Sequence, residues 1–343
     1  SRTAAVEVGS GLLRIEESGS GPVQFVDDSS PDTVDIHDFR GHPDPVTAAL
    51  EWMRRESARP LDVLQDPLAA GAILRVADDR SFWFARSHHI ALDGHGAMNF
   101  MNRAAELYTA SAHGLEPAPC PAVSPAELTR AEDAYRSSRR FDTDRTYWSQ
   151  QTQHLPEPVS LSRSGPAPVS AQSLICGGTL SDSASRALEQ LADETGTSAA
   201  PIIVAAFGAY VAALTGSEDL VLSLPVSGRV TVSLRRSGGM MSNIVPLRLH
   251  VPADTTTGEL VDAVRTRLTG ALRHQRYRHE DIRRDLDGGS GEAGFFGPAV
   301  NIMMFHRQIQ LGDLVGEFNV LSTGPVDDLS VNLYPSVAGG VTR

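Results

Sequence analysis

Lysine is absent from this sequence. All 30 basic residues in the chain of 343 are arginine. Enzymes that form a Schiff base through lysine, pyridoxal-phosphate enzymes, P-loop nucleotide-binding proteins and protein kinases all need a lysine amine, so these classes are excluded. The formal net charge of −12 also argues against nucleic acid or an acidic membrane surface as a partner, since both attract positive charge.

Cysteine and long apolar runs are scarce as well. The two cysteines, Cys120 and Cys176, stand in no CxxC or Cys/His spacing, so the sequence predicts neither a disulfide framework nor a zinc site. No apolar run reaches the ~18 residues of a membrane span, and the opening residues do not form a signal peptide. We therefore expect a cytoplasmic protein without a membrane partner. Because the chain starts without methionine, we also expect a fragment of a longer protein.

Helical and strand patterns alternate along the chain. The first half predicts a helix after the Asp44–Pro45 cap, a hairpin of strands 72–76 and 81–89, a helix ending near Gly114, and an arginine-rich helical stretch over 125–148. The second half predicts strands 174–180, 220–226, 244–251 and 299–305, helices 181–194 and 199–214, and a helix opened by the Thr256–Glu259 capping box. This order is typical of an α/β (α+β) protein with mixed sheets covered by helices.

A change of composition divides the chain. Residues 156–172 are rich in proline, serine and glycine and show no periodicity, which predicts a linker. We therefore expect an N-terminal lobe over 1–155, a linker over 156–172 and a C-terminal lobe over 173–343.

The densest polar segment is HHIALDGHG, residues 88–96. It lies where a predicted strand enters a predicted helix, a position at which clefts form. An imidazole with a pKa near 6.5 can take or hold a proton at neutral pH, and Asp93 can orient a neighbouring side chain. The residues alone leave two interpretations open. Either His88 and His89 take part in catalysis, or one packs and the other caps a turn.

Other chemistries receive little support. Neighbouring strand residues point to opposite faces, so His88 and His89 cannot both reach one metal ion without a bulge, and no HExxH pattern occurs. GxSxG occurs nowhere in the sequence, and neither GSGLLR nor GHGAMN completes GxGxxG, so we expect neither that type of hydrolase nor a nucleotide-binding loop. The arginine cluster at 136, 139, 140 and 145 is typical of a solvated helix face paired with nearby acids.

Five segments together resemble a known family. SHHIALDG resembles the HHxxxDG signature of condensation domains of non-ribosomal peptide synthetases, which are chloramphenicol acetyltransferase-like acyltransferases. Four further segments agree with the family in order: YRSSRRFDTDRTYW, SLPVSGR, GGMMSNIVPLR and RHQRYRHEDI. The resemblance extends from about Ile73 onward, and the wording of the C-terminal part is most similar to siderophore synthetases and acyl-starting lipopeptide modules.

The resemblance implies a fold and its limits. It implies two chloramphenicol acetyltransferase-like lobes, each a mixed sheet covered by helices, in a V-shaped pseudo-dimer with a tunnel between them. The family's opening motif and its RHExLR motif are missing or reduced to GLLRIEES, and the chain stops before the family's last helix. We therefore expect both termini to be truncated.

The resemblance also implies the reaction. A condensation domain forms an amide bond between a donor acyl or peptidyl thioester and the amine of an acceptor aminoacyl thioester. Both substrates are carried on phosphopantetheine arms, so the chain is expected to bind no cofactor or metal of its own. The implied partners are an upstream donor carrier protein, a downstream acceptor carrier protein and an adjacent adenylation domain, with the chain acting as a monomeric domain of a larger synthetase.

Residue roles follow from the same resemblance. His89 is the candidate catalytic group, as general base or as the side chain that positions the amine, and His88 is expected mainly to support it. Asp93 is expected to hold the loop, with Arg229 as its buried partner, because a buried carboxylate needs one. Gly94 would let the pantetheine-bound substrates approach the backbone closely.

Asn243 and the overall function leave alternatives. Asn243 is a candidate for a hydrogen bond between the lobes, but an ordinary strand-end amide fits equally well. A non-catalytic carrier-binding or enzyme-recruiting module would keep the fold without the reaction, although such relatives typically alter the second histidine or the DG. A free-standing acyltransferase is the third possibility.

Overall fold

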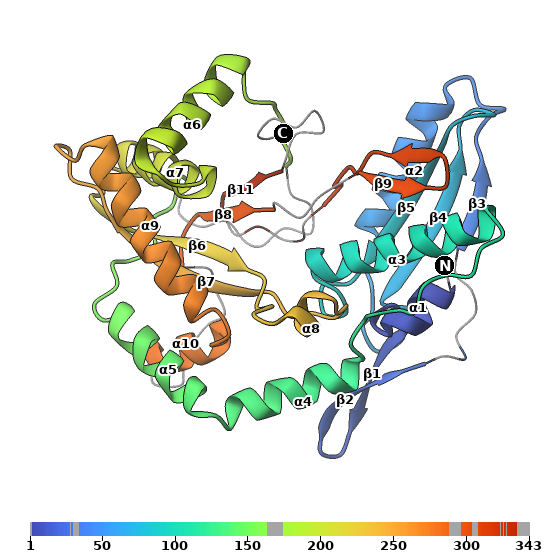
Figure 1. The fold of residues 1–343 in the computed structure, drawn as a ribbon, viewed down its shortest axis with the longest axis horizontal. Coiled ribbons are helices and arrows are strands. Elements are labelled where there is room, and N and C mark those ends of the chain that lie inside the picture. The colour runs from blue at the N-terminus through green and yellow to red at the C-terminus, as the bar shows by residue number, and fades with distance from the viewer. Residues whose placement is uncertain are drawn as a thin grey trace. The chain divides into compact units, whose positions relative to one another are not determined.

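The structure is a computed structural model that describes residues 2–27, 29, 34–162, 174–287, 296–303, 308–322, 324, 326 and 328–334. The chain divides into two compact units. Unit 1 comprises Ser1–Glu132, Arg229–Met241 and Arg307–Gly324, and unit 2 comprises Asp133–Gly228, Ser242–His306 and Pro325–Arg343. Each unit holds mixed strands covered by helices, which confirms the predicted α/β class (Figure 1).

A three-stranded sheet forms the centre of unit 1. Its order is β3 (Val34–Asp38), β4 (Ala69–Arg75) and β5 (Ser81–Ser87), with β3 parallel to β4 and the predicted hairpin joining β4 to β5. Helix α2 (Pro45–Ala58) buries Ala49 and Met53 against one face of this sheet. As the sequence predicts, Asp44 caps that helix, because its side chain accepts a hydrogen bond from the Thr47 amide at 3.1 Å.

Smaller elements complete unit 1. They are α1 (Arg2–Val8), the antiparallel pair β1 (Leu13–Ser18) and β2 (Gly21–Val26), α3 (Gly94–Ala112), α8 (Val232–Arg235) and the pair β9 (Ile309–Leu311) and β10 (Leu314–Gly316). Helix α4 (Pro125–Arg136) runs across the sequence boundary between the two units. The β1–β2 pair escaped prediction because most of its residues are polar or exposed, so the strands lack the alternation that marks a half-buried strand.

Unit 2 is built on a four-stranded sheet of order β11-β8-β6-β7. Strands β6 (Asp219–Val226) and β7 (Asn243–His250) are antiparallel, whereas β8 (Ala299–Ile302) runs parallel to both β6 and β11 (Ser330–Leu333). Helices α7 (Ala199–Thr215) and α9 (Thr257–Arg273) contribute to the same apolar core as this sheet (Figure 1). Helix α6 (Asp182–Thr195) packs beside α7, and α10 (His279–Asp287) packs beside α5 (Arg139–Gln151).

The division between the units differs from the expected boundary at residue 155. The chain enters unit 2 at Asp133, because α5 places Trp148, only 2 % exposed, in the core of unit 2. The Trp148 indole Nε1 also donates to the His274 carbonyl at 2.9 Å. The chain then returns to unit 1 over Arg229–Met241, which no change of composition announces. Most of the predicted linker, 163–172, lies outside the described residues.

Two predicted elements differ in the structure. Residues 174–180 are irregular rather than a strand, and Leu174 and Ile175 are exposed, so this run pairs with none of the strands that the structure describes. The arginine-rich helical stretch over 125–148 breaks into α4 and α5. Ser138 interrupts it by capping α5 through a hydrogen bond from the Phe141 amide.

The almost wholly apolar helix predicted over 199–214 is α7, which places Ile202, Val204 and Val211 in the core of unit 2 and leaves Tyr210 and Leu214 exposed. Among the helices that the structure describes, none alone has the length and apolarity to cross a membrane. Helices α6 and α7 meet that test only as a pair, and they are bent by 110° at the break between them.

The burial of β6 gives a prediction for stability. Replacing the fully buried Leu222 by alanine should lower the free energy of unfolding by about 2–5 kcal/mol, because the core of unit 2 loses contacts and keeps a cavity. Leu214→Ala, at a position that is 58 % exposed, should change it by less than about 0.5 kcal/mol. Urea unfolding of both variants measures the difference, and equal losses would contradict the placement of β6 in the core.

Candidate active site

The histidine pair lies in a turn that follows β5. The His88 amide donates to the Leu68 carbonyl at 2.7 Å, and the His88 carbonyl accepts from the Ala91 amide at 3.0 Å. His88 Nδ1 accepts from the Ile90 amide at 3.2 Å, so the His88 ring is engaged in closing the turn. His89 is exposed within this turn. The two neighbouring imidazoles therefore differ in their surroundings.

The protonation of His88 fits that contact. Burial lowers the pKa of His88 below its ordinary value, and the neighbouring His89 lowers it further. The hydrogen bond from Ile90 requires Nδ1 to be free of a proton, as it is in a neutral ring that carries its proton on Nε2. His88 is thus a neutral acceptor that supports the turn on which His89 stands.

Asp93 is the single carboxylate of residues 88–96, and both of its oxygens accept hydrogen bonds. Its Oδ1 caps α3 by accepting from the Gly96 amide at 2.8 Å. Its Oδ2 accepts from Arg229 Nη1 at 2.6 Å and from the Met241 amide at 2.8 Å. The expected Asp93–Arg229 pair is therefore present, and it joins residues 136 positions apart within unit 1.

The environment keeps Asp93 ionised. Burial acts to raise the pKa of its carboxyl, but the charge of Arg229, the hydrogen bond from that guanidinium and the two backbone amides lower it to below its ordinary value. Arg229 is buried as well, and its Nη2 donates to the carbonyls of Gly238 and Gly239 at 3.0 and 3.1 Å. Asp93 consequently holds the structure together and is poorly suited to donate a proton.

A close approach of two backbone segments occurs at Gly96. A Cβ at Gly96 would lie 2.8 Å from the Gly239 carbonyl oxygen and 3.1 Å from the Gly238 carbonyl carbon. Gly94 is the half-buried first residue of α3, and its expected role toward a substrate stays a prediction. The need for glycine at 96 escaped prediction because the contacting segment is more than 140 residues away.

Asn243 belongs to unit 2, and its side chain bonds to four other residues of that unit. Its amide nitrogen donates to the carbonyls of Gln275 and Tyr277 at 2.9 and 2.7 Å. Its Oδ1 accepts from the amides of Ile244 and His279 at 3.0 and 2.8 Å. These bonds fit the strand-end alternative, because one buried amide fixes the segment that leads into α10.

The HQ pair at 274–275, which the sequence interpretation left without a role, fixes the same segment. Gln275 accepts from the Gly228 amide at 3.0 Å and donates to the Leu272 carbonyl at 2.8 Å. His274 Nδ1 lies 2.7 Å from Asp144 Oδ1, and Tyr135 donates to the other oxygen of that carboxylate at 2.8 Å. These contacts give the HQ pair a structural role in unit 2.

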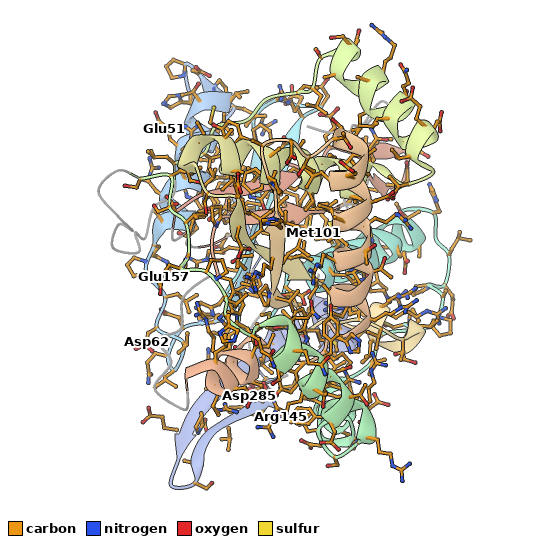
Figure 2. The ribbon with its side chains drawn as sticks, turned by 90° about the vertical axis from the view of Figure 1, so that its left-hand side faces the viewer. Glu51, Asp62, Met101, Arg145, Glu157 and Asp285 are labelled. Atoms are coloured by element: carbon orange, nitrogen blue, oxygen red, sulfur yellow. The ribbon has the colours of Figure 1, made fainter. Side chains whose placement is uncertain are left out.

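The arginine cluster is paired with acids, as predicted, but two of the acids are distant in sequence. Arg145 forms a forked pair with Asp285 of α10 at 2.9 and 3.1 Å, and Figure 2 shows these two side chains together. Arg136 pairs with Asp281, also of α10, at 2.9 Å. Arg140 pairs with Asp144 at 2.8 Å. The cluster therefore attaches α4 and α5 to α10 rather than forming a phosphate site.

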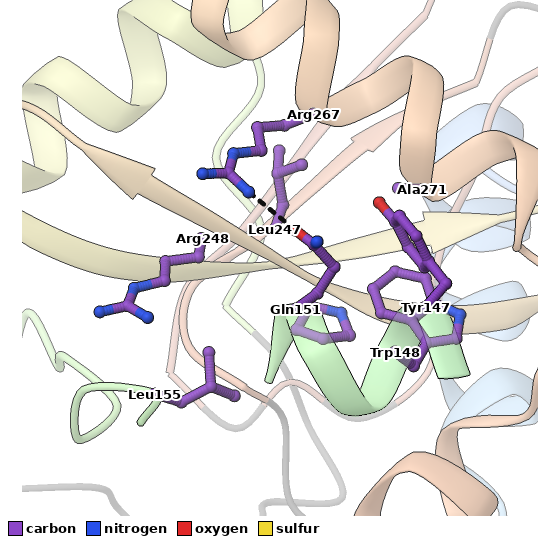
Figure 3. Close-up of a pocket in the computed structure, with 9 residues that line it drawn as sticks. Tyr147, Trp148, Gln151, Leu155, Leu247, Arg248, Arg267 and Ala271 are labelled. Atoms are coloured by element: carbon purple, nitrogen blue, oxygen red, sulfur yellow. Dashed lines mark hydrogen bonds between the residues drawn. The ribbon is translucent and has the colours of Figure 1, made fainter. Parts of the chain in front are cut away.

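A small pocket in unit 2 is separate from these residues. Helices α5 and α9, strand β7 and the segment that follows α5 line it with Tyr147, Trp148, Gln151, Leu155, Pro246, Leu247, Arg248, Arg267 and Ala271 (Figure 3). Arg267 donates to Gln151 across it at 2.7 Å, and Arg248 is paired with Asp219. None of the predicted site residues lines it. Within the part of the chain that the structure describes, no three His, Cys, Asp or Glu side chains gather as a metal site would require.

Comparison with known proteins identifies the family. The model of the condensation domain family matches residues 12–332, which is nearly the whole chain. The chain belongs to the condensation domain family. The resemblance inferred from HHxxxDG and the four later segments is thereby confirmed.

Long synthetases are among the relatives of this condensation domain. It is 34 % identical over 332 residues to a dimodular nonribosomal peptide synthase of Bacillus subtilis (strain 168) and 37 % identical over 309 residues to an isonitrile lipopeptide synthase of Streptomyces coeruleorubidus. These matches include 96 % and 89 % of this chain but only 14 % and 21 % of the relatives. Enterobactin synthase component F of Escherichia coli (strain K12) is 30 % identical over 339 residues, which is 96 % of this chain and 26 % of that protein.

Solved structures agree in fold. The first condensation domain of the calcium-dependent antibiotic synthetase, in complex with a substrate analogue, matches with a TM-score of 0.88 and 31 % identity, over 99 % of this chain and 79 % of that one. The starter condensation domain of rhizomide synthetase, in complex with C8-CoA, matches with a TM-score of 0.89 and 31 % identity, over 97 % and 75 %. Condensation domains are amide-forming acyltransferases of nonribosomal peptide synthetases, so this chain is an acyltransferase of that class.

The buried ion pair gives a prediction for stability. Asp93→Asn should lower the free energy of unfolding by about 3–5 kcal/mol, because the Arg229 guanidinium is left buried without its counter-charge. Asp219→Asn is the matched control, since the Asp219–Arg248 pair is about one-third exposed and should cost less than about 1 kcal/mol. Urea unfolding compares the two, and equal costs would show that the Asp93–Arg229 pair has no special weight.

The contact of His88 predicts a pH dependence. A histidine whose folded pKa lies below its unfolded value binds a proton more readily in the unfolded chain. Its contribution to stability is present above the unfolded pKa near 6.5 and is lost as the pH falls below it. In His88→Asn, whose amide oxygen can still accept from Ile90, the drop in melting temperature from about pH 7.5 to about pH 5.5 should be smaller than in the wild type. Identical drops would contradict the buried, neutral state of His88.

Proposed function

We propose that this condensation domain works inside a larger synthetase and joins a donor acyl thioester to the amine of an acceptor aminoacyl thioester. Both substrates would be presented on phosphopantetheine arms by an upstream and a downstream carrier protein, with an adenylation domain adjacent. The observation that carries the proposal is the exposed His89 on a turn that His88, Asp93 and Arg229 hold rigidly.

The reaction asks little of the protein beyond placement. The acceptor nitrogen forms a bond to the thioester carbonyl carbon, the carbon–sulfur bond breaks, and the donor arm leaves as a thiol with the proton that the amine gives up. A thioester is already activated, so the site must supply orientation, a group near the nitrogen and relief of developing charge. The His89 imidazole serves at the nitrogen, either by taking up the proton or by orienting the amine.

The different exposure of His89 and Asp93 gives them different proposed roles. Asp93 is buried, ionised and bonded through both oxygens, so it acts through the backbone that it fixes. His89, by contrast, is exposed, so its imidazole is accessible to a substrate. A rigid turn under an accessible imidazole is the arrangement that positioning chemistry needs, because even small displacements of a reacting group slow a reaction strongly.

The donor is proposed to be a starting acyl group. Two relatives are named for a lipopeptide and for enterobactin, and one similar structure is a starter condensation domain in complex with C8-CoA. These likenesses support the acyl-starting subtype. Rate comparison between an acyl-loaded and an aminoacyl-loaded donor carrier tests it, and preference for the aminoacyl donor would refute it.

The remaining features of the proposal concern setting. Cys120 and Cys176 are both free thiols, which supports a reducing, cytoplasmic site of action. We propose that the chain acts as a single copy. A non-catalytic carrier-binding module and a free-standing acyltransferase are the competing functions. Product formed only from carrier-bound substrates excludes both.

The catalytic assignment gives the main prediction. In a reaction of a chemically loaded donor carrier with a loaded acceptor carrier, His89→Ala should reduce the rate of amide formation by about 10²–10⁴-fold, the usual range for a lost acid–base or positioning group. His88→Asn, which keeps an acceptor for the Ile90 amide, should reduce it far less. Intact-protein mass spectrometry of the acceptor carrier measures the product. An undiminished rate with His89→Ala would reject the catalytic role of His89.

A further inference from the structure

We propose that His95 and Asn99 are positioning residues that clamp the segment 229–241 onto α3, the helix that follows the histidine turn. The inference rests on the proposed function, because it concerns the same reaction. Both residues belong to unit 1, as does the whole of the clamped segment. They lie four positions apart in α3 and therefore on one side of that helix.

The clamp consists of side chains that hold backbone carbonyls. His95 Nε2 lies 2.9 Å from the Arg235 carbonyl oxygen. Asn99 Nδ2 donates to the same oxygen at 2.9 Å and to the Ser237 carbonyl at 2.7 Å. Two side chains of one helix thus fix the end of α8 and the residues that follow it.

The state of His95 suits this contact. Burial lowers the pKa of the His95 imidazole, and the charges of Arg229 and Arg235 lower it further, against the hydrogen bond to the Arg235 carbonyl and the charge of Asp93, which raise it. A carbonyl oxygen only accepts, so His95 Nε2 must carry the proton and donate it. The ring needs no positive charge to make this bond.

The clamped segment includes two groups that donate hydrogen bonds to Asp93 Oδ2. Arg229 begins it and Met241 ends it, and each donates to Asp93 Oδ2. Between them, the Gly239 carbonyl accepts from the Asp93 amide at 3.3 Å. Displacement of the Arg235–Ser237 backbone would therefore move the donors around the carboxylate that caps α3, next to the turn of His88 and His89.

The segment packs closely against its neighbours at Gly238 and Gly239. A Cβ at Gly238 would lie 2.5 Å from Val8 Cγ1 and 2.8 Å from Ser10 Oγ, and Gly239 has a φ of 77°. Gly96, one residue after His95, meets the Gly239 carbonyl oxygen. Glycine at these three positions lets the two stretches of backbone come close together but adds no side-chain contact that would fix their relative position. The hydrogen bonds of His95 and Asn99 therefore set where the segment lies along α3.

The test compares substitutions that keep or remove the donors. His95→Phe keeps the ring shape but cannot donate, and we expect the turnover number for amide formation to fall about tenfold with KM for the loaded carriers changed less than about twofold. His95→Gln places an amide nitrogen near the position of Nε2 and should restore the turnover number to within about threefold of the wild type. Asn99→Leu should behave like His95→Phe.

A matched control and a second readout complete the design. Asn102→Leu makes the same change at an exposed position of α3 and should leave the rate as in the wild type. Hydrogen exchange should show faster exchange of the amides in 235–241 in His95→Phe and Asn99→Leu, but not in His95→Gln or Asn102→Leu.

The outcomes separate the clamp from the proposed function. Slow turnover with fast exchange in the two donor-less variants, rescued by His95→Gln, supports the clamp. Unchanged exchange in both donor-less variants overturns it, and so does a His95→Gln variant as slow as His95→Phe. Absence of product from the wild type would reject the proposed function alone, since the exchange experiment still decides whether the clamp exists.

Discussion

The buried ion pair of Asp93 and Arg229 is the interaction on which the rest of unit 1 depends. Removing two charges from water costs several kcal/mol per ion, so the pair is tolerated only where every remaining hydrogen-bonding position is satisfied. Asp93 offsets part of this cost by accepting from the amides of Gly96 and Met241, and Arg229 does so by donating through Nη2 to the carbonyls of Gly238 and Gly239. One contact therefore fixes the start of α3, the histidine turn and a distant stretch of chain together.

The chemistry explains why such rigidity is located here. A thioester supplies its own activation, and what remains is to hold a nitrogen and a carbonyl carbon in line, which is a matter of geometry. The absence of lysine suits this task, because a guanidinium stays charged when buried and offers donors in a planar fork, whereas a buried lysine tends to lose its proton. Arg229 uses that fork toward one carboxylate and two carbonyls.

Local patterns in the sequence predicted local structure well. The Asp44 cap, the β4–β5 hairpin and the apolar helix α7 each depend on neighbouring residues, whereas the partner of Asp93 was implied by the resemblance to the family. Contacts between distant segments could not be read in this way. The bonds of His95 and Asn99 go to backbone carbonyls more than 130 residues away, which have no sequence signature. The run at 174–180 predicted a strand, but the structure describes these residues as irregular, with Leu174 and Ile175 exposed.

The central claim is that Asp93 acts on the reaction by holding the turn that carries His89. A double-mutant cycle between Asp93→Asn and His89→Ala, read as single-turnover amide formation between loaded carriers, tests this claim directly. If Asp93 works through His89, the Asp93→Asn change will slow the wild type strongly and have little further effect once the imidazole is gone. Independent effects, in which the two losses multiply, would contradict it and leave Asp93 with a separate role.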